Sequence, residues 1–292
     1  MRTRIATTVM VAGVAAAAAL MSPVFASAHT GDAGPFGPGN RAADHGLISV
    51  GLTSDQRLVG FDVRKPSDTW VLGKVSGLRG DTMLVGIDFR VQNGTLYGVG
   101  DRGGIYTLTS GAKAVKVSQL TVALQGKHFG VDFNPAADRL RVISDTGQNL
   151  RHNVADQTTP TAVDGVLTNP TTPPSTALGV TGAAYTNNDL DAATATTLFD
   201  IDTTSNRVSL QSPANAGTLA PTGNLGVDVG PSAGFDIYYK ASDGSNRGFA
   251  ALSTDGQQRF YKVNVLDGRA DLVGAFPAAR QVVDIALPLN QN

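Results

Sequence analysis

Several residue types are missing from this chain of 292 residues, and each absence excludes something. There is no cysteine, so stability must come from a large core or from closure of the fold rather than from disulfides. There is no glutamate either, because all 24 acidic residues are aspartate. This excludes the His-Glu-x-x-His zinc-protease motif and any mechanism with a glutamate base. Since aspartate favours turns over helix interiors, the bias also predicts turn-rich β structure.

Aromatic residues and long apolar runs are scarce as well. Trp70 is the single tryptophan, which gives little support for an aromatic platform that stacks sugars or bases. Beyond the first residues of the chain, no apolar run approaches the length that spans a bilayer, so we expect no transmembrane segment after signal cleavage.

The first 28 residues have the features of a secretory signal peptide. Arg2 and Arg4 supply a basic start, Ile5 to Met21 form an apolar run, and Ala26-Ser27-Ala28 is a small-residue cleavage site. An uncleaved anchor is the alternative, but the polar exit with its Ala-x-Ala site favours cleavage. We therefore predict a signal peptide over residues 1–28 and a secreted, extracellular or cell-envelope location.

The mature chain is expected to begin at His29 with a leader over residues 29–46 that is too rich in Gly and Pro to order itself. Removal of the signal peptide lowers the basic count from 23 to 21 against 24 acidic residues, for a net charge of −3. No nucleic-acid partner is expected at this charge. Residues 47–292 are predicted to form one all-β domain, a size that sandwiches and barrels reach without splitting.

A repeated unit organises this domain, and its clearest copy is Gly130 to Asn153. Its innermost strand recurs at intervals of 44, 52, 52 and 48 residues, in Gly86–Phe89, Gly130–Phe133, Gly182–Tyr185, Gly234–Ile237 and Val282–Ile285. The unit that begins near Gly86 contains four alternating runs, Leu84–Val91, Thr95–Gly100, Gly104–Leu108 and Val115–Leu120. Four short strands per unit at this period predict the blades of a β-propeller.

The two ends of the chain complete one blade. The last unit has only its first strand, Val282–Leu287, whereas the domain opens with three strands that lack one, Leu47–Thr53, Arg57–Val63 and Trp70–Ser76. Joining these fragments closes the ring and protects otherwise exposed strand edges. The count is then five four-stranded blades, or six if Leu225–Gly230 is a further innermost strand.

The same stretches carry a family resemblance. Gly130 to Asn153, with Asn93–Tyr97 before it and Thr197–Asp202 after it, resembles the bacterial family catalogued as domain of unknown function 4394. The resemblance extends over about Leu47 to Leu287. It implies a secreted or cell-surface, propeller-like domain, and it implies no activity, substrate or catalytic residue.

The repeated aspartate carries the most chemistry. Asp88, Asp132, Asp236 and Asp284 occupy the same position of their innermost strands, which are packed on both faces, so these carboxylates should be buried and need donors or a cation. The favoured interpretation is structural, with each carboxylate accepting a backbone N–H of the neighbouring blade. The alternative is a metal site in the channel that holds Ca²⁺, the only cofactor considered. Ala184 interrupts the series.

Other motifs are weaker. Asp145-Thr146-Gly147 matches the aspartic-protease triplet, but Asp243-Gly244 and Asp255-Gly256 lack its central residue, so an ordinary turn is favoured. His128 and His152 lie near the same unit as Asp132 and Asp145, and a His-Asp pair could support nucleophilic catalysis by Ser144 only if the fold brought these residues together. No catalytic residue is predicted.

The longest insert, Asp156 to Gly179, is expected to be an irregular loop across one end of the disc, either binding a ligand or merely connecting strands. We therefore expect a monomeric, non-enzymatic binding or scaffold propeller whose partner is a small molecule, a glycan or a protein. The alternative is an extracellular hydrolase or lyase with a calcium-like metal held by the channel aspartates.

Overall fold

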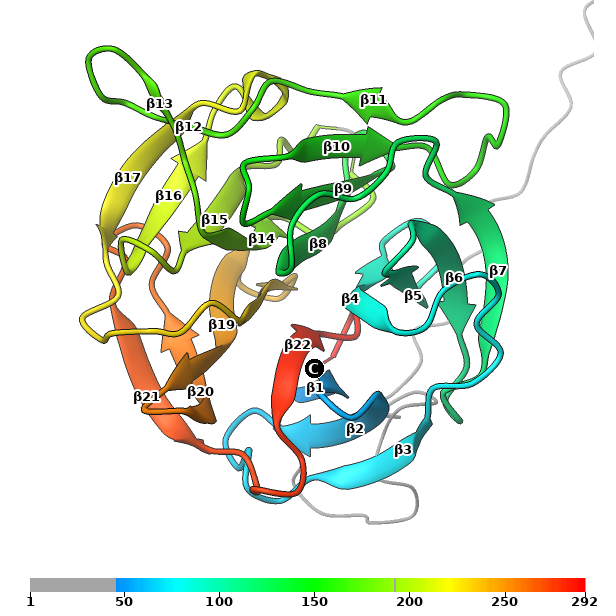
Figure 1. Cartoon of the computed structure of the whole chain (residues 1–292). Helices are drawn as coiled ribbons and strands as arrows, with labels where there is room; N and C mark the ends of the chain where they lie inside the picture. The colour runs from blue at the N-terminus through cyan, green and yellow to red at the C-terminus, as the bar shows by residue number, and fades with distance from the viewer. Residues whose placement is uncertain (1–45, 192, 292) are drawn as a thin grey trace, which may run out of the picture. The chain divides into compact units, whose positions relative to one another are not determined.

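Short runs of alternating residues separated by Gly, Asn and Asp turns form antiparallel strands in the computed structural model, which describes residues 46–191 and 193–291. The strands build five four-stranded sheets arranged as blades around a centre (Figure 1). Each blade is given from its inner to its outer strand. One blade contains β4 (Leu84–Arg90), β5 (Thr95–Gly100), β6 (Gly104–Leu108) and β7 (Ala114–Gln119), and the next contains β8 (Phe129–Asn134), β9 (Arg139–Ser144), β10 (Asn149–His152) and β11 (Ala162–Val163). The third contains β14 (Val180–Tyr185), β15 (Leu198–Asp202), β16 (Arg207–Gln211) and β17 (Leu219–Asn224). The fourth blade contains β18 (Ala233–Lys240), β19 (Ser245–Thr254), β20 (Gln257–Val263) and β21 (Ala270–Ala275). The fifth contains β22 (Val282–Ala286), β1 (Ile48–Thr53), β2 (Arg57–Asp62) and β3 (Trp70–Lys74).

The last of these blades joins the two ends of the described chain, as the sequence predicts. β22 is its innermost strand and pairs antiparallel with β1, with Leu52 opposite Asp284. The possibility of a sixth blade is wrong, because residues 225–230 form no strand. The predicted signal peptide, and the predicted leader except for Gly46, lie outside the described residues.

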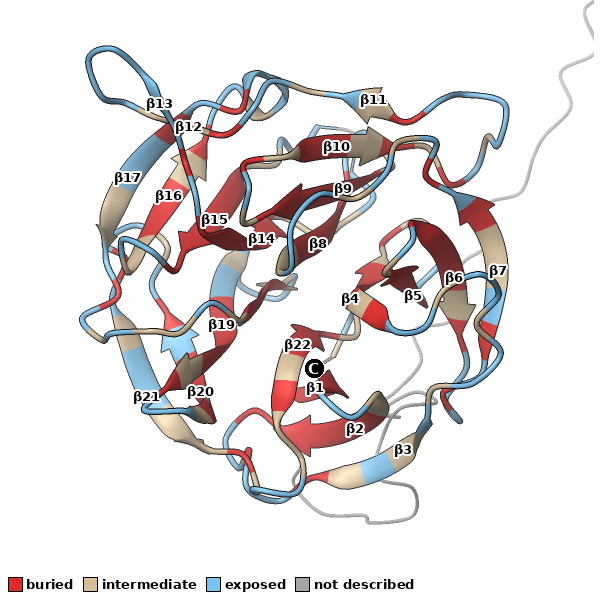
Figure 2. Ribbon diagram, viewed as in Figure 1, coloured by how far each residue is buried: buried red, intermediate tan, exposed pale blue. Residues whose placement is uncertain are grey.

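Burial falls from the centre of the propeller to its rim. The innermost strands are mostly buried, whereas β3, β7, β17 and β21 alternate with exposed positions (Figure 2). Apolar side chains fill the space between adjacent blades, so the core is a set of interblade layers. In one layer Phe61 lies edge-on to Phe260 and Phe276, each with ring centroids 5.1 Å away. Such contacts stabilise by about 1 kcal/mol each beyond area burial.

The long insert differs from the expectation of an irregular loop across one end of the disc. It supplies β11, the outer strand of its blade, and then the strand pair β12 (Thr168–Asn169) and β13 (Ser175–Thr176). This pair lies at the outer rim beside β17, where Thr168 bridges to Thr218 (Figure 1). The insert therefore connects the outer edges of two blades.

Candidate functional site

Close packing of the innermost strands shapes the centre of the propeller, and glycine permits it. A Cβ atom at Gly130 would lie 2.8 Å from the backbone nitrogen of Ala183 on the next inner strand. At Gly182 it would lie 3.0 Å from the Cβ of Phe235 on the strand after that. Each glycine precedes the repeated aspartate position by two residues, so the strands approach closely enough for a carboxylate to reach its neighbour.

The repeated carboxylates use this proximity to join the blades. Each accepts a hydrogen bond from a backbone N–H of the next inner strand or, for Asp236, of the residue that directly follows that strand. The pairs are Asp284 with Ile87 (2.7 Å), Asp88 with Phe133 (2.7 Å), Asp132 with Tyr185 (3.1 Å) and Asp236 with Leu287 (2.6 Å). These are the contacts that the structural interpretation of the repeat predicts. Ala184 leaves the fifth joint, between β14 and β18, without such a bond.

Three of the four carboxylates also converge. Asp88, Asp132 and Asp236 each offer an oxygen within 4.8 Å of the others, whereas Asp284 lies outside this group. All four side chains are buried. Burial raises the pKa of each carboxyl group, that of Asp236 to about 7, and repulsion from neighbouring carboxylates raises the pKa of Asp88, Asp132 and Asp284 further.

A buried arginine lies directly across the sheet from Asp132, and the sequence reasoning missed it. Arg141 on β9 is 1% exposed and donates four hydrogen bonds to a buried polar network. Its partners are Tyr185 Oη (3.2 Å), Asn149 Oδ1 (2.7 Å), Asp164 Oδ2 (2.6 Å) and Asn215 Oδ1 (2.8 Å). The signal was a charged residue inside the apolar run Leu140–Ile143, which is typical of a buried, paired group.

The remaining motif candidates do not form a catalytic arrangement in the described residues. Asp145-Thr146-Gly147 is a turn, with Asp145 Oδ1 accepting the Lys127 N–H (3.0 Å) and Gly147 at φ 85°. His152 lies within hydrogen-bond distance of two hydroxyls, Ser118 Oγ (2.8 Å) and Thr161 Oγ1 (3.0 Å), and burial lowers its pKa. Ser144 instead contacts Thr146.

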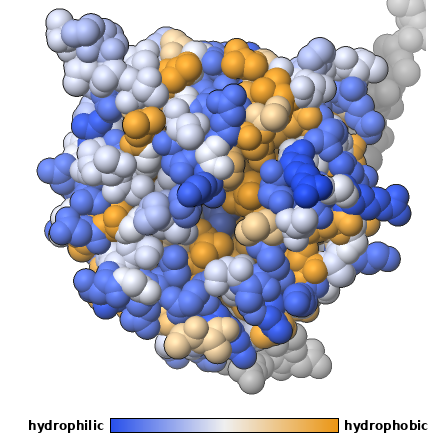
Figure 3. Space-filling model, in the orientation of Figure 1, coloured by the Kyte–Doolittle hydropathy of each residue, from blue (hydrophilic) through white to orange (hydrophobic). Residues whose placement is uncertain are grey.

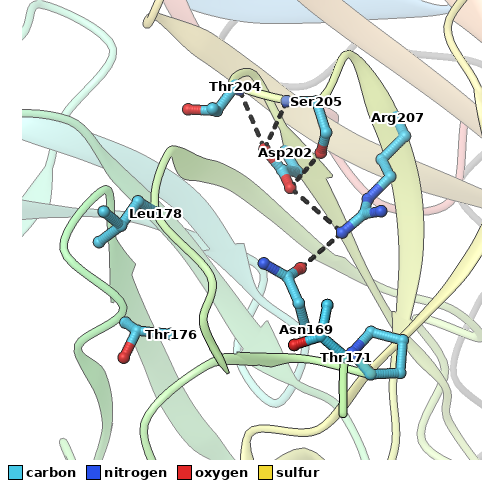
Figure 4. A pocket seen from close by; sticks show the side chains of 9 residues that line it. Asn169, Thr171, Thr176, Leu178, Asp202, Thr204, Ser205 and Arg207 are labelled. Atoms are coloured by element: carbon cyan, nitrogen blue, oxygen red, sulfur yellow. Dashed lines mark hydrogen bonds and ion pairs between the residues drawn. The ribbon is translucent and has the colours of Figure 1, made fainter. Parts of the chain in front are cut away.

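A second feature lies at the rim, where the insert meets the turn between β15 and β16. They enclose an open hollow of about 390 Å³ (Figure 4). Asp202 orders the turn by accepting the N–H groups of Thr204 (2.9 Å) and Ser205 (3.0 Å). Arg207 reaches across to the insert and donates to Asn169 Oδ1 (2.5 Å), while its buried Nε–H has no acceptor in the described part of the chain. The sequence pointed to the insert but not to this turn.

The face in view carries polar and apolar side chains intermixed around a recess at its centre (Figure 3). Within residues 46–191 and 193–291, no helix has the length and apolar character needed to cross a membrane.

Fold and centre together define a five-bladed β-propeller whose inner strands bury a repeated aspartate. The family described as "Domain of unknown function (DUF4394)" matches residues 57–286, and the chain belongs to this family. No curated protein matches the chain.

Solved structures show distant likeness. A structural genomics protein of unknown function from Bacteroides thetaiotaomicron is 13% identical with a TM-score of 0.45, over 85% of this chain and 66% of that one. A chain from a nidogen/laminin complex is 8% identical with a TM-score of 0.45, over 84% and 99%. An auxiliary nutrient binding protein from Bacteroides ovatus is 14% identical with a TM-score of 0.40, over 69% and 55%. The chain thus spans less than two thirds of both Bacteroides proteins, and no function is transferred from any of the three.

Proposed function

We propose that the protein is a secreted or cell-surface propeller that acts as a monomer and binds a saccharide in the rim hollow without chemically changing it. The observation that carries this proposal is Arg207, which lines the hollow and whose buried Nε–H has no acceptor among residues 46–191 and 193–291. Buried donors are normally satisfied, so a ligand oxygen is a fitting partner.

The lining of the hollow suits a hydroxyl-rich ligand. The exposed residues Thr176 and Thr204 carry hydroxyls that can both donate and accept, as sugar hydroxyls do, while the Thr171 hydroxyl, which donates to Pro173 O (2.8 Å), can still accept. Leu178, which is 57% exposed, offers apolar surface for the C–H face of a sugar ring. Loops held by a rigid scaffold are common places for binding. Export rests on the predicted signal peptide.

The alternative of a hydrolase or lyase with a channel metal is less well supported. Asp88, Asp132 and Asp236 are at most 5% exposed, so a metal that they held would be shielded from a substrate. Catalytic metals need an open coordination position that substrate or water can reach.

The test is a glycan array followed by calorimetric titration of the best saccharide into wild type and Arg207→Ala. A lost hydrogen bond from a charged donor is worth about 1.5–3 kcal/mol, so the variant should bind at least about tenfold more weakly. Arg247→Ala is the matched control, because Arg247 is half-exposed, pairs with Asp243 in another blade and should leave affinity unchanged. Equal saccharide binding by wild type and Arg207→Ala, or binding of peptides alone, would contradict the proposal. Mass spectrometry of secreted protein should find an N-terminus at His29.

A further inference from the structure

The converging carboxylates at the centre pair with no basic side chain among the described residues. In the described ranges, no ion pair joins Asp88, Asp132 or Asp236 to a lysine, arginine or histidine. Burying an ionised carboxylate costs several kcal/mol unless a counter-charge or proton compensates. The cluster must therefore hold either protons or a cation.

The carboxylate oxygens of the cluster keep lone pairs for a ligand in addition to their hydrogen bonds with backbone N–H groups. Asp132 is 1% exposed, and its Oδ1 accepts the Tyr185 N–H while its Oδ2 has no partner in the described residues. Asp236 accepts amides at both oxygens, from Leu287 and from Ile237 (2.6 Å each). Because an ionised carboxylate has about four acceptor sites, these bonds orient the groups without saturating them.

The spacing of the oxygens matches the size of a calcium site. Ca²⁺ binds oxygen ligands at about 2.4 Å, so two of its ligands lie at most about 4.8 Å apart. The three carboxylate oxygens meet this limit. A site of oxygens alone, with neither cysteine nor histidine, selects a hard cation over zinc or copper.

We infer that Asp88, Asp132 and Asp236 bind one Ca²⁺ ion that links three blades at the centre of the propeller. The three residues come from β4, β8 and β18, so the ion adds a cross-link between segments distant in sequence. In a chain without disulfides, such a link stabilises the closed ring by binding the folded state alone.

The test uses the full mature protein stripped of metal with a chelator and dialysed. Calorimetric titration with CaCl₂ should show one site, and the melting temperature should rise with calcium concentration. Asp132→Asn keeps an acceptor for the Tyr185 N–H and removes the charge. Asp236→Asn also removes the charge, but it keeps an acceptor for only one of the two amides that Asp236 binds. Each should weaken calcium binding by at least about tenfold, as ligand charge sets affinity in oxygen sites. Asp255→Asn, at an exposed turn, is the matched control and should bind like wild type.

Three outcomes would overturn the inference. The stripped wild type could take up no calcium, which would assign protons to the cluster. Both asparagine variants could bind calcium like wild type, which would place the ion elsewhere. Magnesium could bind more tightly than calcium. Elemental analysis of wild type purified in calcium-containing buffer needs no variant, and it should find about one calcium per chain.

Discussion

The two joints that flank the β14–β17 blade are packed alike but differ in polarity. The joint with β8–β11, here the polar joint, contains Asp132, Arg141 and Asp200. The joint with β18–β21, here the apolar joint, has Ala184 against an apolar cluster that includes Phe235. Glycine lets the inner strands approach closely at both. The comparison shows that two inner strands can pack closely without a carboxylate between them, so the buried carboxylates of the polar joint are not needed for close packing.

The largest expected effect comes from breaking the polar joint at Arg141. Arg141→Met removes the buried one of the two arginines that pair with Asp164, and it leaves Asn149 and Asn215 with unmatched acceptors. Breaking a buried pair in this way should lower the free energy of unfolding by about 3–5 kcal/mol, measured by urea denaturation. Arg151→Met is the control, because Arg151 also contacts Asp164 (3.1 Å) but is one third exposed and should lose under about 1 kcal/mol. Equal losses would mean that the network around Arg141 adds nothing.

A smaller effect should follow from adding charge to the apolar joint. Ala184→Asp completes the series of carboxylates but places one among apolar side chains, where Ala184 is fully buried. It should destabilise the protein by about 1–3 kcal/mol at pH 7. Ala184→Asn is the control for the size of the new side chain. Only the aspartate variant should recover stability at pH 5, because a buried aspartate can be protonated there and an asparagine does not titrate. A stable Ala184→Asp protein at pH 7 would show that this joint can also stabilise a charge.

The smallest predicted effect is a pH dependence of the metal-free protein. The pKa of Asp236 is about 7 when folded, above the value of 3.8 for an unperturbed aspartate, so the folded state retains a proton that the unfolded chain releases. The stability from this proton is fully present below pH 3.8 and is lost as pH rises through about 7. In chelator, the melting temperature should therefore fall between pH 5 and pH 8.

Asp236→Asn isolates the contribution of that group, which faces Asp88, Asp132 and Asp284 from the other inner strands. The variant should flatten the pH dependence of the free energy of unfolding by about 1 kcal/mol per pH unit between pH 5 and pH 7, or roughly 2–4 °C per pH unit for a domain of this size. Thermal scans in chelator at several pH values measure it. The same slope in wild type and variant would remove Asp236 as its source.

The strands of the propeller could be predicted because their signals are local. The runs at Thr95–Gly100 and Gly104–Leu108 are strands with the predicted bounds. The possible extra strand at Leu225–Gly230 was wrong, because its backbone serves tertiary contacts. The Leu225 oxygen accepts the N–H of Ala270, and the Val229 N–H binds the side chain of Asn206 (3.0 Å).

The candidate site could be predicted only in part. The repeat identified all four aspartates, but it could not show that Asp284 lies outside the group of three. The hydrogen-bond network of Arg141 could not be predicted from the sequence, for another reason. Its partners Asp164 and Asn215 come from an insert and a loop that no repeat aligns.

The sequence by itself determined the β class and the five-unit repeat, because alternation and turn residues act within a few residues of each other. The incomplete units at the two ends of the repeat predicted that they share one blade. Tertiary structure alone decided which carboxylates meet and which joint carries a buried arginine. Those distances depend on how five blades close into a ring, and closure depends on β1 pairing with β22 at the opposite end of the chain. Local sequence patterns therefore predict the strands, whereas the distances between residues of different blades are set only when the ring closes.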